Sequence, residues 1–184
     1  MNIFIDIIGS WFVRASMIVV ALTLVVNMND ALYKRSTKAN ARSTYAWVDS
    51  LIYADLSAAC FDVTKVFTHS DSVFLNATAT AMDFWADTSD AAGSYKVKYY
   101  TSYDGSTMRY SLYREVKPLP ALLLGSKFTQ VKFNYYNAAG DSVTSLPYGK
   151  IRRVRVFISS VVENLGTADS TISSDFTVYP SRLF

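Results

Sequence analysis

The sequence predicts an α+β protein in which a long N-terminal α-helix, apolar in its first half, packs on an antiparallel β-sheet head. Three observations predict this class. Apolar residues dominate positions 3–28, apolar residues at helical spacing recur through positions 44–60, and the remaining chain contains runs rich in aromatic and β-branched residues. We divide the 184 residues into an apolar transmembrane or filament-core helix (1–28), a helical stalk packed on the head (29–61) and a β-rich globular head (62–184).

The first segment is long enough and apolar enough to cross a bilayer. Positions 3–28 have the sequence IFIDIIGSWFVRASMIVVALTLVVNM, and about 26 helical residues exceed the roughly 30 Å of a hydrocarbon core. Asp6 and Arg14 interrupt the segment, and each is unfavourable near a bilayer centre by about 2.5 to 3.5 kcal/mol. We therefore expect both charges to find partners, and Asp6 could meet Arg14 of a neighbouring helix.

Basic residues after this segment bear on its orientation. Lys34, Arg35, Lys38 and Arg42 follow it, and the positive-inside tendency would place the head of an ordinary single-pass anchor in the cytoplasm. A basic leader removed from before Met1 would permit an extracellular head, because orientation is set on the precursor. The same four side chains could bind anionic lipid or acids on adjacent subunits, or form a solvated stalk face.

Nothing in the sequence ends the helix at the membrane surface. No proline precedes Pro118, and the only glycine before Gly93 is Gly9. Apolar stalk residues recur every three or four positions and predict one stripe buried against the head: Val48, Leu51, Ile52, Leu56, Ala59 and Cys60. A helix over residues 4–60 would be roughly 85 Å long, so its first half must protrude, and a protruding apolar helix needs neighbours.

The head is predicted to be an antiparallel sheet of four to six strands, with one face covered by the helix and the other partly wet. The Asp104-Gly105 pair predicts a tight hairpin turn with positive φ angles, and Ala139-Gly140-Asp141 predicts a second turn. The predicted strands lie near residues 80–86, in two runs within 95–116, and within 127–143, 150–164 and 175–184.

Four passages resemble the type IV pilins, and within them the J-type minor pseudopilins and related minor pilins. SLIYADLSAACF resembles the end of the family's helix, and YKVKYYTSYDGSTMRYSLYREV resembles its paired strands, with a Leu-Tyr-Arg element at 112–114. ALLLGSKFTQVKFNYYNAAGDSV is similar to the family's leucine, glycine and Val-x-Phe-x-Tyr stretch, and IRRVRVFISSVV to its following strand. Together these passages cover most of residues 45–162.

The N-terminus departs from the family. The Gly-Phe-Thr-Leu-Ile-Glu processing signal of the family is absent. In the family a Glu five residues into the mature chain compensates a neighbour's terminal amine, and Asp6 is the only acid nearby here. Asp6 would be the fifth residue if Met1 were lost, and a divergent or unprocessed pilin-like protein is the alternative.

The resemblance and the protruding helix together imply a structural subunit of a type IV pilus-like surface filament. Its partners would be copies of itself through the N-terminal helices, the inner membrane before assembly, and a pilus or secretion assembly machinery. Its location would be the inner membrane and then the cell surface. The alternatives are a minor pseudopilin of a secretion or uptake machine, and a monomeric membrane-anchored binding or sensory domain.

Enzymatic activity, cofactors and nucleic-acid binding are not expected. Cys60 and His69 are the only residues of their kinds, so a disulfide, a thiolate zinc site and a Ser-His-Asp triad lack their partners. No phosphate-binding glycine loop or nucleophile elbow is present. The net charge of +3 comes from scattered basic residues without the cluster that tracks phosphates.

Three further patterns have competing interpretations. The acids Asp83, Asp87, Asp90, Asp104 and Asp141 could bind calcium, but no EF-hand spacing is present, and we interpret them as solvated turn and strand-edge acids. Asn76-Ala77-Thr78 is a possible glycosylation site. The abundant tyrosines could suggest an electron-conducting fibre, but we interpret them as cross-strand packing with phenol groups at the rim: Tyr99, Tyr100, Tyr110, Tyr113, Tyr135 and Tyr136.

Overall fold

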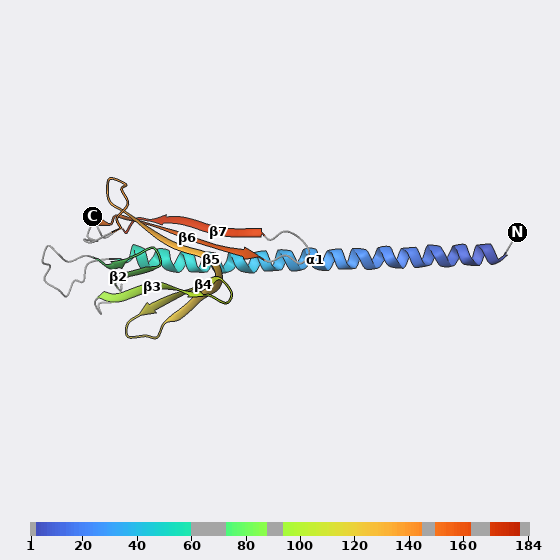
Figure 1. Cartoon of the computed structure of the whole chain (residues 1–184), viewed down its shortest axis with the longest axis horizontal. Coiled ribbons are helices and arrows are strands. Elements are labelled where there is room, and N and C mark those ends of the chain that lie inside the picture. The colour runs from blue at the N-terminus through green and yellow to red at the C-terminus, as the bar shows by residue number, and fades with distance from the viewer. Residues whose placement is uncertain (1–2, 60–72, 88–93, 145–149, 163–169, 181–184) are drawn as a thin grey trace.

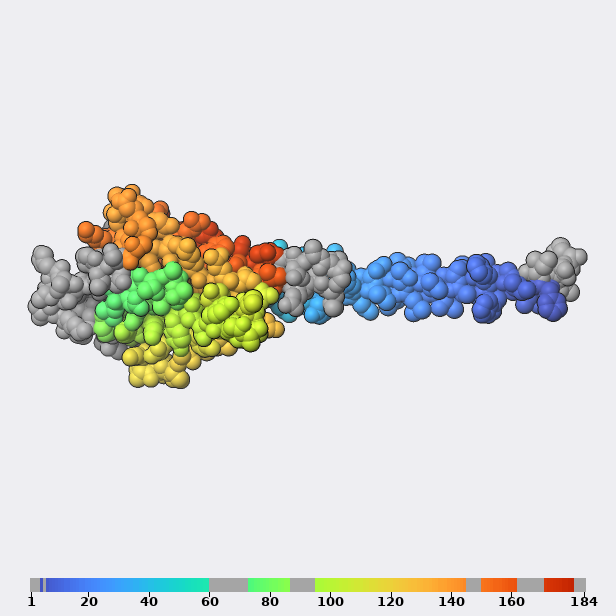
Figure 2. Space-filling model, viewed as in Figure 1, coloured from blue at the N-terminus to red at the C-terminus, as the bar shows by residue number. Residues whose placement is uncertain are grey.

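The protein consists of one long helix and one seven-stranded antiparallel sheet, which confirms the predicted α+β class. A computed structural model describes residues 3–59, 73–87, 94–144, 150–162 and 170–180. The helix α1 (Ile3–Ser57) is continuous over 55 residues. Only its C-terminal part lies against the sheet, so the N-terminal part extends from the head as a rod (Figures 1 and 2).

The strands follow one another across the sheet in chain order, and each neighbouring pair is antiparallel. They are β1 (Phe74–Ala77), β2 (Ala81–Asp87), β3 (Ser94–Asp104), β4 (Arg109–Val116), β5 (Leu122–Tyr136), β6 (Arg153–Val162) and β7 (Ser170–Val178). The expected four to six strands are therefore too few. The strand that sequence analysis missed is β1, whose four residues are too short to show an alternating pattern.

One stripe of α1 forms the helix side of the core. Tyr45, Val48, Ile52 and Leu56 are buried, at intervals of three or four residues, which is the spacing of a single helix face. Ala59 is also buried, but it lies beyond the end of α1 and forms a β-bridge with Ala86. Leu51 is partly buried beside them. The stripe begins with Tyr45, one turn before the first stripe residue expected from the sequence, and the ring of Tyr45 stacks on Phe128 of β5 with 5.9 Å between centroids.

The long strand β5 changes partners halfway and thereby curls the sheet around the end of α1. Its first part pairs with β4 and its second part with β6, and Phe128 takes part in both registers. Lys127, next to this point, has a positive φ of 67°, and the β4–β5 register shifts nearby, as at a β-bulge. The turn between β1 and β2 contacts β5, where the Phe133 amide donates a hydrogen bond to the Ala79 carbonyl at 2.9 Å.

The β3–β4 hairpin is present, but its turn differs from the tight two-residue turn expected from the sequence. Asp104 pairs with Arg109, which leaves a four-residue loop, and the positive φ of 53° belongs to Met108 rather than Gly105. The longer loop is stabilised by Asp104, whose carboxylate accepts hydrogen bonds from the Ser106 amide (2.9 Å) and from the Ser106 and Thr107 hydroxyls. Between β5 and β6, Gly140 has a φ of 94° in the second expected turn.

Candidate functional site

The most prominent surface of the described chain is the apolar N-terminal part of α1, residues 4–28, which we call the exposed apolar segment. Its large apolar side chains are between 52% and 77% exposed: Phe4, Ile7, Ile8, Trp11, Phe12, Val13, Met17, Ile18, Val19, Val20, Leu22, Leu24, Val25, Val26 and Met28. Figure 2 shows this segment as a bare rod beyond the head. An 18-residue window of α1 has a mean hydropathy of 1.9, so the helix is long and apolar enough to cross a membrane.

Asp6 and Arg14 lie on one ridge of this segment, with Ser10 between them at intervals of four residues. Asp6, Ile7, Ser10, Trp11 and Arg14 line a shallow hollow on the helix surface. Eight residues of helix rise about 12 Å, which separates the two charged groups along the axis. The two charges therefore mark one side of an otherwise uncharged apolar surface.

The opposite end of α1 is fixed to β3 and β4 by a buried charge cluster. Asp55 is 5% exposed, and Arg114 of β4 donates to its Oδ2 from Nε (2.6 Å) and to its Oδ1 from Nη2 (2.9 Å). Tyr99 of β3 donates its phenol proton to Oδ2 at 2.5 Å. The bond to Asp55 raises the pKa of Arg114 above its usual value, and burial followed by the Asp55 charge raises the pKa of Tyr99.

A second set of hydrogen bonds fixes α1 to the last strands. The Tyr45 hydroxyl donates to Ser160 Oγ of β6 at 2.7 Å and to the Ile172 carbonyl of β7 at 3.3 Å. One turn further along the helix, Ser174 of β7 donates to Asp49 Oδ2 at 2.5 Å. Burial raises the pKa of the Asp49 carboxyl, and the Ser174 bond opposes this shift. The head therefore holds α1 through two separate parts of its curled sheet, β3–β4 and β6–β7.

Between these anchors and the exposed apolar segment lies the basic stretch of the stalk. Lys34 pairs with Asp30, four residues before it, at 2.6 Å, and Lys34 and Lys38 are partly buried. Arg35 and Arg42 are exposed. The stretch thus combines a local ion pair with exposed cationic side chains, and the roles considered from the sequence stay predictions.

The described acidic residues among those considered for calcium do not come together. Asp83 is 9% exposed and pairs with Lys96 at 3.0 Å, so its interpretation as a solvated acid is wrong. Asp104 stabilises the β3–β4 loop, and Asp141 accepts a hydrogen bond from the Asn137 side chain. The Asp87 side chain and all of Asp90 lie outside the described residues. Within the described ranges, no group of three or more His, Cys, Asp or Glu residues is placed to hold a metal ion.

The tyrosines occupy two kinds of place. Tyr100 and Tyr113 are cross-strand partners with stacked rings 5.2 Å apart, and Tyr103 and Tyr110 are cross-strand partners with tilted rings 4.9 Å apart. Tyr136 lies under the Arg153 guanidinium at 4.3 Å. Two tyrosines are not at the rim as expected. Tyr99 is buried against Asp55, a buried carboxylate that needs donors, and buried Tyr135 donates to the Thr78 and Ala81 carbonyls of the β1–β2 turn.

Of three other predicted positions, only Asn76 lies within the described residues. Asn76 is partly buried on β1, at the edge of the sheet and opposite Asp83. Its sequon partner Thr78 is exposed, and the Thr78 hydroxyl bonds the backbone of Ala81. Cys60 and His69 lie outside the described residues.

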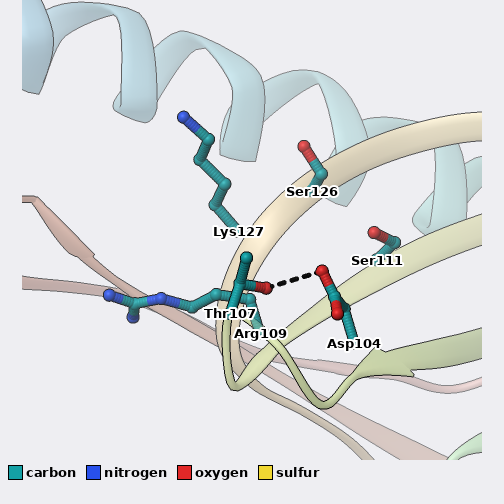
Figure 3. A pocket seen from close by; sticks show the side chains of 6 residues that line it. All are labelled: Asp104, Thr107, Arg109, Ser111, Ser126 and Lys127. Carbon is teal, nitrogen blue, oxygen red and sulfur yellow. Dashed lines mark hydrogen bonds between the residues drawn. The ribbon is translucent and has the colours of Figure 1, made fainter.

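A polar hollow at the β3–β4 hairpin shows no convergent binding geometry. It is lined by Asp104, Thr107, Arg109, Ser111, Ser126 and Lys127. Figure 3 shows that the Arg109 and Lys127 side chains extend outward in different directions instead of meeting in the hollow. Asp104 is already bound to Thr107 at 2.9 Å. The exposed apolar segment is therefore the better candidate for a functional surface.

One long N-terminal helix joined to an antiparallel sheet that holds its C-terminal part is a pilin-like architecture. No family model matches the chain, and no curated protein or solved structure matches it. The class of the molecule is thus described by its architecture, and its function has to be argued from its surface.

Proposed function

We propose that the chain is a structural subunit of a type IV pilus-like surface filament, and that it assembles by packing its N-terminal helices side by side. The observation that carries this proposal is the exposed apolar segment, which projects away from a head that covers none of it. An apolar helix of this length is stable in a bilayer or among other apolar helices, and it is unfavourable bare in water.

Burial supplies the driving force for assembly. Each Å² of apolar surface removed from water contributes about 25 cal/mol, and a helix surrounded by several neighbours buries apolar side chains around its whole circumference. The exposed residues lie on all sides of α1: Met17, Ile18, Val19 and Val20 are consecutive and exposed, and each is turned by about 100° from the one before it. A helix that is apolar on all sides is buried more completely at the centre of a bundle than by contact with a single flat surface.

The two anchors of α1 give the head a defined position on the helix. Asp55 ties the helix end to β3 and β4, while Tyr45 and Asp49 tie it to β6 and β7. When such helices bundle, each head is placed on the outside at a fixed height above its own apolar segment. Repetition of one contact then produces an open, growing assembly.

In this proposal the subunit has two environments. Before assembly the exposed apolar segment lies in the inner membrane, and an assembly machinery of the pilus or secretion type transfers the chain into the filament at the cell surface. The basic stretch of the stalk, residues 34–42, would then sit close to the membrane surface, where lysine and arginine side chains favour anionic lipid.

The test is negative-stain microscopy of material sheared from the cell surface, with peptide identification of its subunits. We expect filaments in which this chain is the abundant component. Trace amounts in filaments made of another protein would instead support a minor pseudopilin. A detergent-solubilised monomer that forms no filament and no contact between copies would contradict the proposal and support a membrane-anchored binding or sensory domain.

A further inference from the structure

We infer that neighbouring α1 helices pack parallel with an axial offset of eight residues, about 12 Å, so that Asp6 of one copy lies beside Arg14 of the next. This inference rests on the proposed filament and adds the register of its helix contact. The occupant of the charged side of the exposed apolar segment is therefore a second copy of the same chain.

The charge pattern of a single copy leads to this register. Asp6 and Arg14 are the only charged residues between Ile3 and Asn29, and both are exposed on the rod. Their two-turn separation prevents a close ion pair within one helix. A buried charge without a partner is strongly unfavourable in apolar surroundings, so burial of the segment among its neighbours requires a pairing between copies.

Only some arrangements of two helices satisfy this requirement. With no offset, parallel helices place Asp6 beside Asp6 and Arg14 beside Arg14. With an offset of eight residues, opposite charges meet, and Ser10 of one copy faces Ile18 of the next, on the same i, i+4 ridge. Both of these side chains are exposed in the single chain, so the ridge is available for contact.

An antiparallel pair centred on Ser10 would also join Asp6 to Arg14, twice within one dimer. Such a dimer uses all its charges, carries its heads at opposite ends and has a closed, isologous interface. The parallel offset leaves one free Asp6 at one end of a row and one free Arg14 at the other. It therefore continues by repetition, and it keeps all heads at the same end of their helices, as insertion into one membrane requires.

Cysteine cross-linking of the full-length chain distinguishes these registers. In a Cys60→Ser background, cells co-express one copy with Ser10→Cys and one with Ile18→Cys, and sheared filaments are oxidised. We expect the mixed 10–18 disulfide to form at least about ten times more efficiently than the 10–10 disulfide, because disulfides require Cα atoms within about 7 Å. Dominant 10–10 linkage would overturn the offset in favour of an antiparallel or unshifted pair.

The same experiment separates the register from the proposed function. Intact filaments without the 10–18 disulfide would overturn the register and leave the filament standing. Loss of all linkage, with only monomers in the membrane, would overturn both.

Charge reversal provides an independent test. Asp6→Arg or Arg14→Asp alone should lower the amount of assembled chain at least about tenfold, because like charges then meet in an apolar contact. The double variant Asp6→Arg/Arg14→Asp should restore assembly. Circular dichroism of the solubilised chain verifies that the head, which these residues do not touch, remains folded. Equal assembly of the single reversals and wild type would overturn the pairing.

Discussion

Arg114 binds both carboxylate oxygens of Asp55, with Nε–Oδ2 at 2.6 Å and Nη2–Oδ1 at 2.9 Å, and so joins β4 to the last turns of α1. The Asp55 side chain is 6% exposed and the Arg114 side chain 20%. A bidentate pair fixes orientation as well as distance. The direction in which the rod leaves the head therefore depends on this pair and on the Tyr45 and Asp49 contacts at the other side of the sheet.

Replacing Arg114 with methionine should destabilise the folded head by about 3 kcal/mol or more, because Asp55 would remain as a buried charge without its cation. The measurement is chemical unfolding of the detergent-solubilised chain, followed by near-ultraviolet circular dichroism. Arg155→Met is the matched control, since Arg155 forms a bidentate pair with Asp175 on the exposed face of β6 and β7. Similar losses of stability in the two variants would contradict the role of burial.

The charge of Asp49 should affect the stability of the fold in the opposite way to the charge of Asp55, which lies six residues further along the same helix. Asp49 has the Ser174 hydroxyl as partner and no cation among the described contacts, and its Oδ1 finds no partner among the described residues. Its raised folded-state pKa means that the unfolded chain releases this proton at lower pH than the folded chain. The stability contributed by Asp49 is thus present below about pH 3.8 and is lost as pH rises through the folded-state pKa.

Asp49→Asn should therefore leave stability at pH 7 unchanged or raise it by up to about 1 kcal/mol, since partial exposure screens the charge. It should also remove part of the decline in stability between pH 4 and neutrality, as measured by unfolding midpoints across that range. Asp55→Asn is the comparison and should be clearly destabilising at pH 7. A destabilised Asp49→Asn chain with an unchanged pH profile would show that the charge itself is needed.

Gly125 in β5 has no room for a side chain. A Cβ at this position would lie 2.6 Å from Cζ and 2.9 Å from Cε2 of Phe128, whose buried ring stacks on Tyr45 of α1. Gly125→Ala should destabilise the chain by about 1 to 3 kcal/mol, because the ring must move out of a packed core. Gly105→Ala, with nothing within 4 Å and no positive φ, should change the unfolding midpoint little. Equal midpoints for both variants would contradict the crowding at Phe128.

The sequence predicted the helix and strands of this fold better than the way in which the sheet curls around the helix. The apolar stripe of α1 and the alternating strands are local patterns, which is why the helix and six strands could be expected from composition and spacing alone. The partner exchange within β5 could not be expected from the sequence, because it depends on a bulge at Lys127 and on contacts between distant strands. The tight turn predicted at Asp104 was wrong for a related reason. The hydrogen bonds of the Asp104 side chain with Ser106 and Thr107 stabilise a longer loop than the Asp-Gly pair predicts.

The buried polar contacts of the helix were missed, although one signal was available. Asp49 and Asp55 flank the apolar stripe at Ile52 and Leu56, and an acid on the buried face of a helix predicts a partner on the element packed against it. The identity of that partner, Arg114 with Tyr99 for Asp55 and Ser174 for Asp49, required the three-dimensional register. The charges Asp6 and Arg14 stood out at once, because nothing else in the segment is charged.

A charge placed in the middle of the exposed apolar segment should separate assembly from folding. Val20 is 59% exposed within the exposed apolar segment and lies more than one helical turn from Arg14. Val20→Lys adds a charge that is unfavourable by about 3 kcal/mol in an apolar environment. In a helix bundle this penalty recurs in every subunit, so sheared filaments should be lost while the head keeps its unfolding midpoint.

Two controls define what that loss would mean. Ser36→Lys adds the same charge to the exposed stalk, outside the apolar segment, and should leave assembly near wild type. Val20→Ala keeps the position apolar and should weaken assembly less than the lysine variant does. Membrane fractionation shows whether the Val20→Lys chain is still inserted, because a lysine can reach the bilayer surface by snorkelling. If the inserted Val20→Lys chain forms filaments as abundantly as wild type, the apolar segment does not form the buried core of an assembly, and the surface that carries the proposed function would have to lie elsewhere on the molecule.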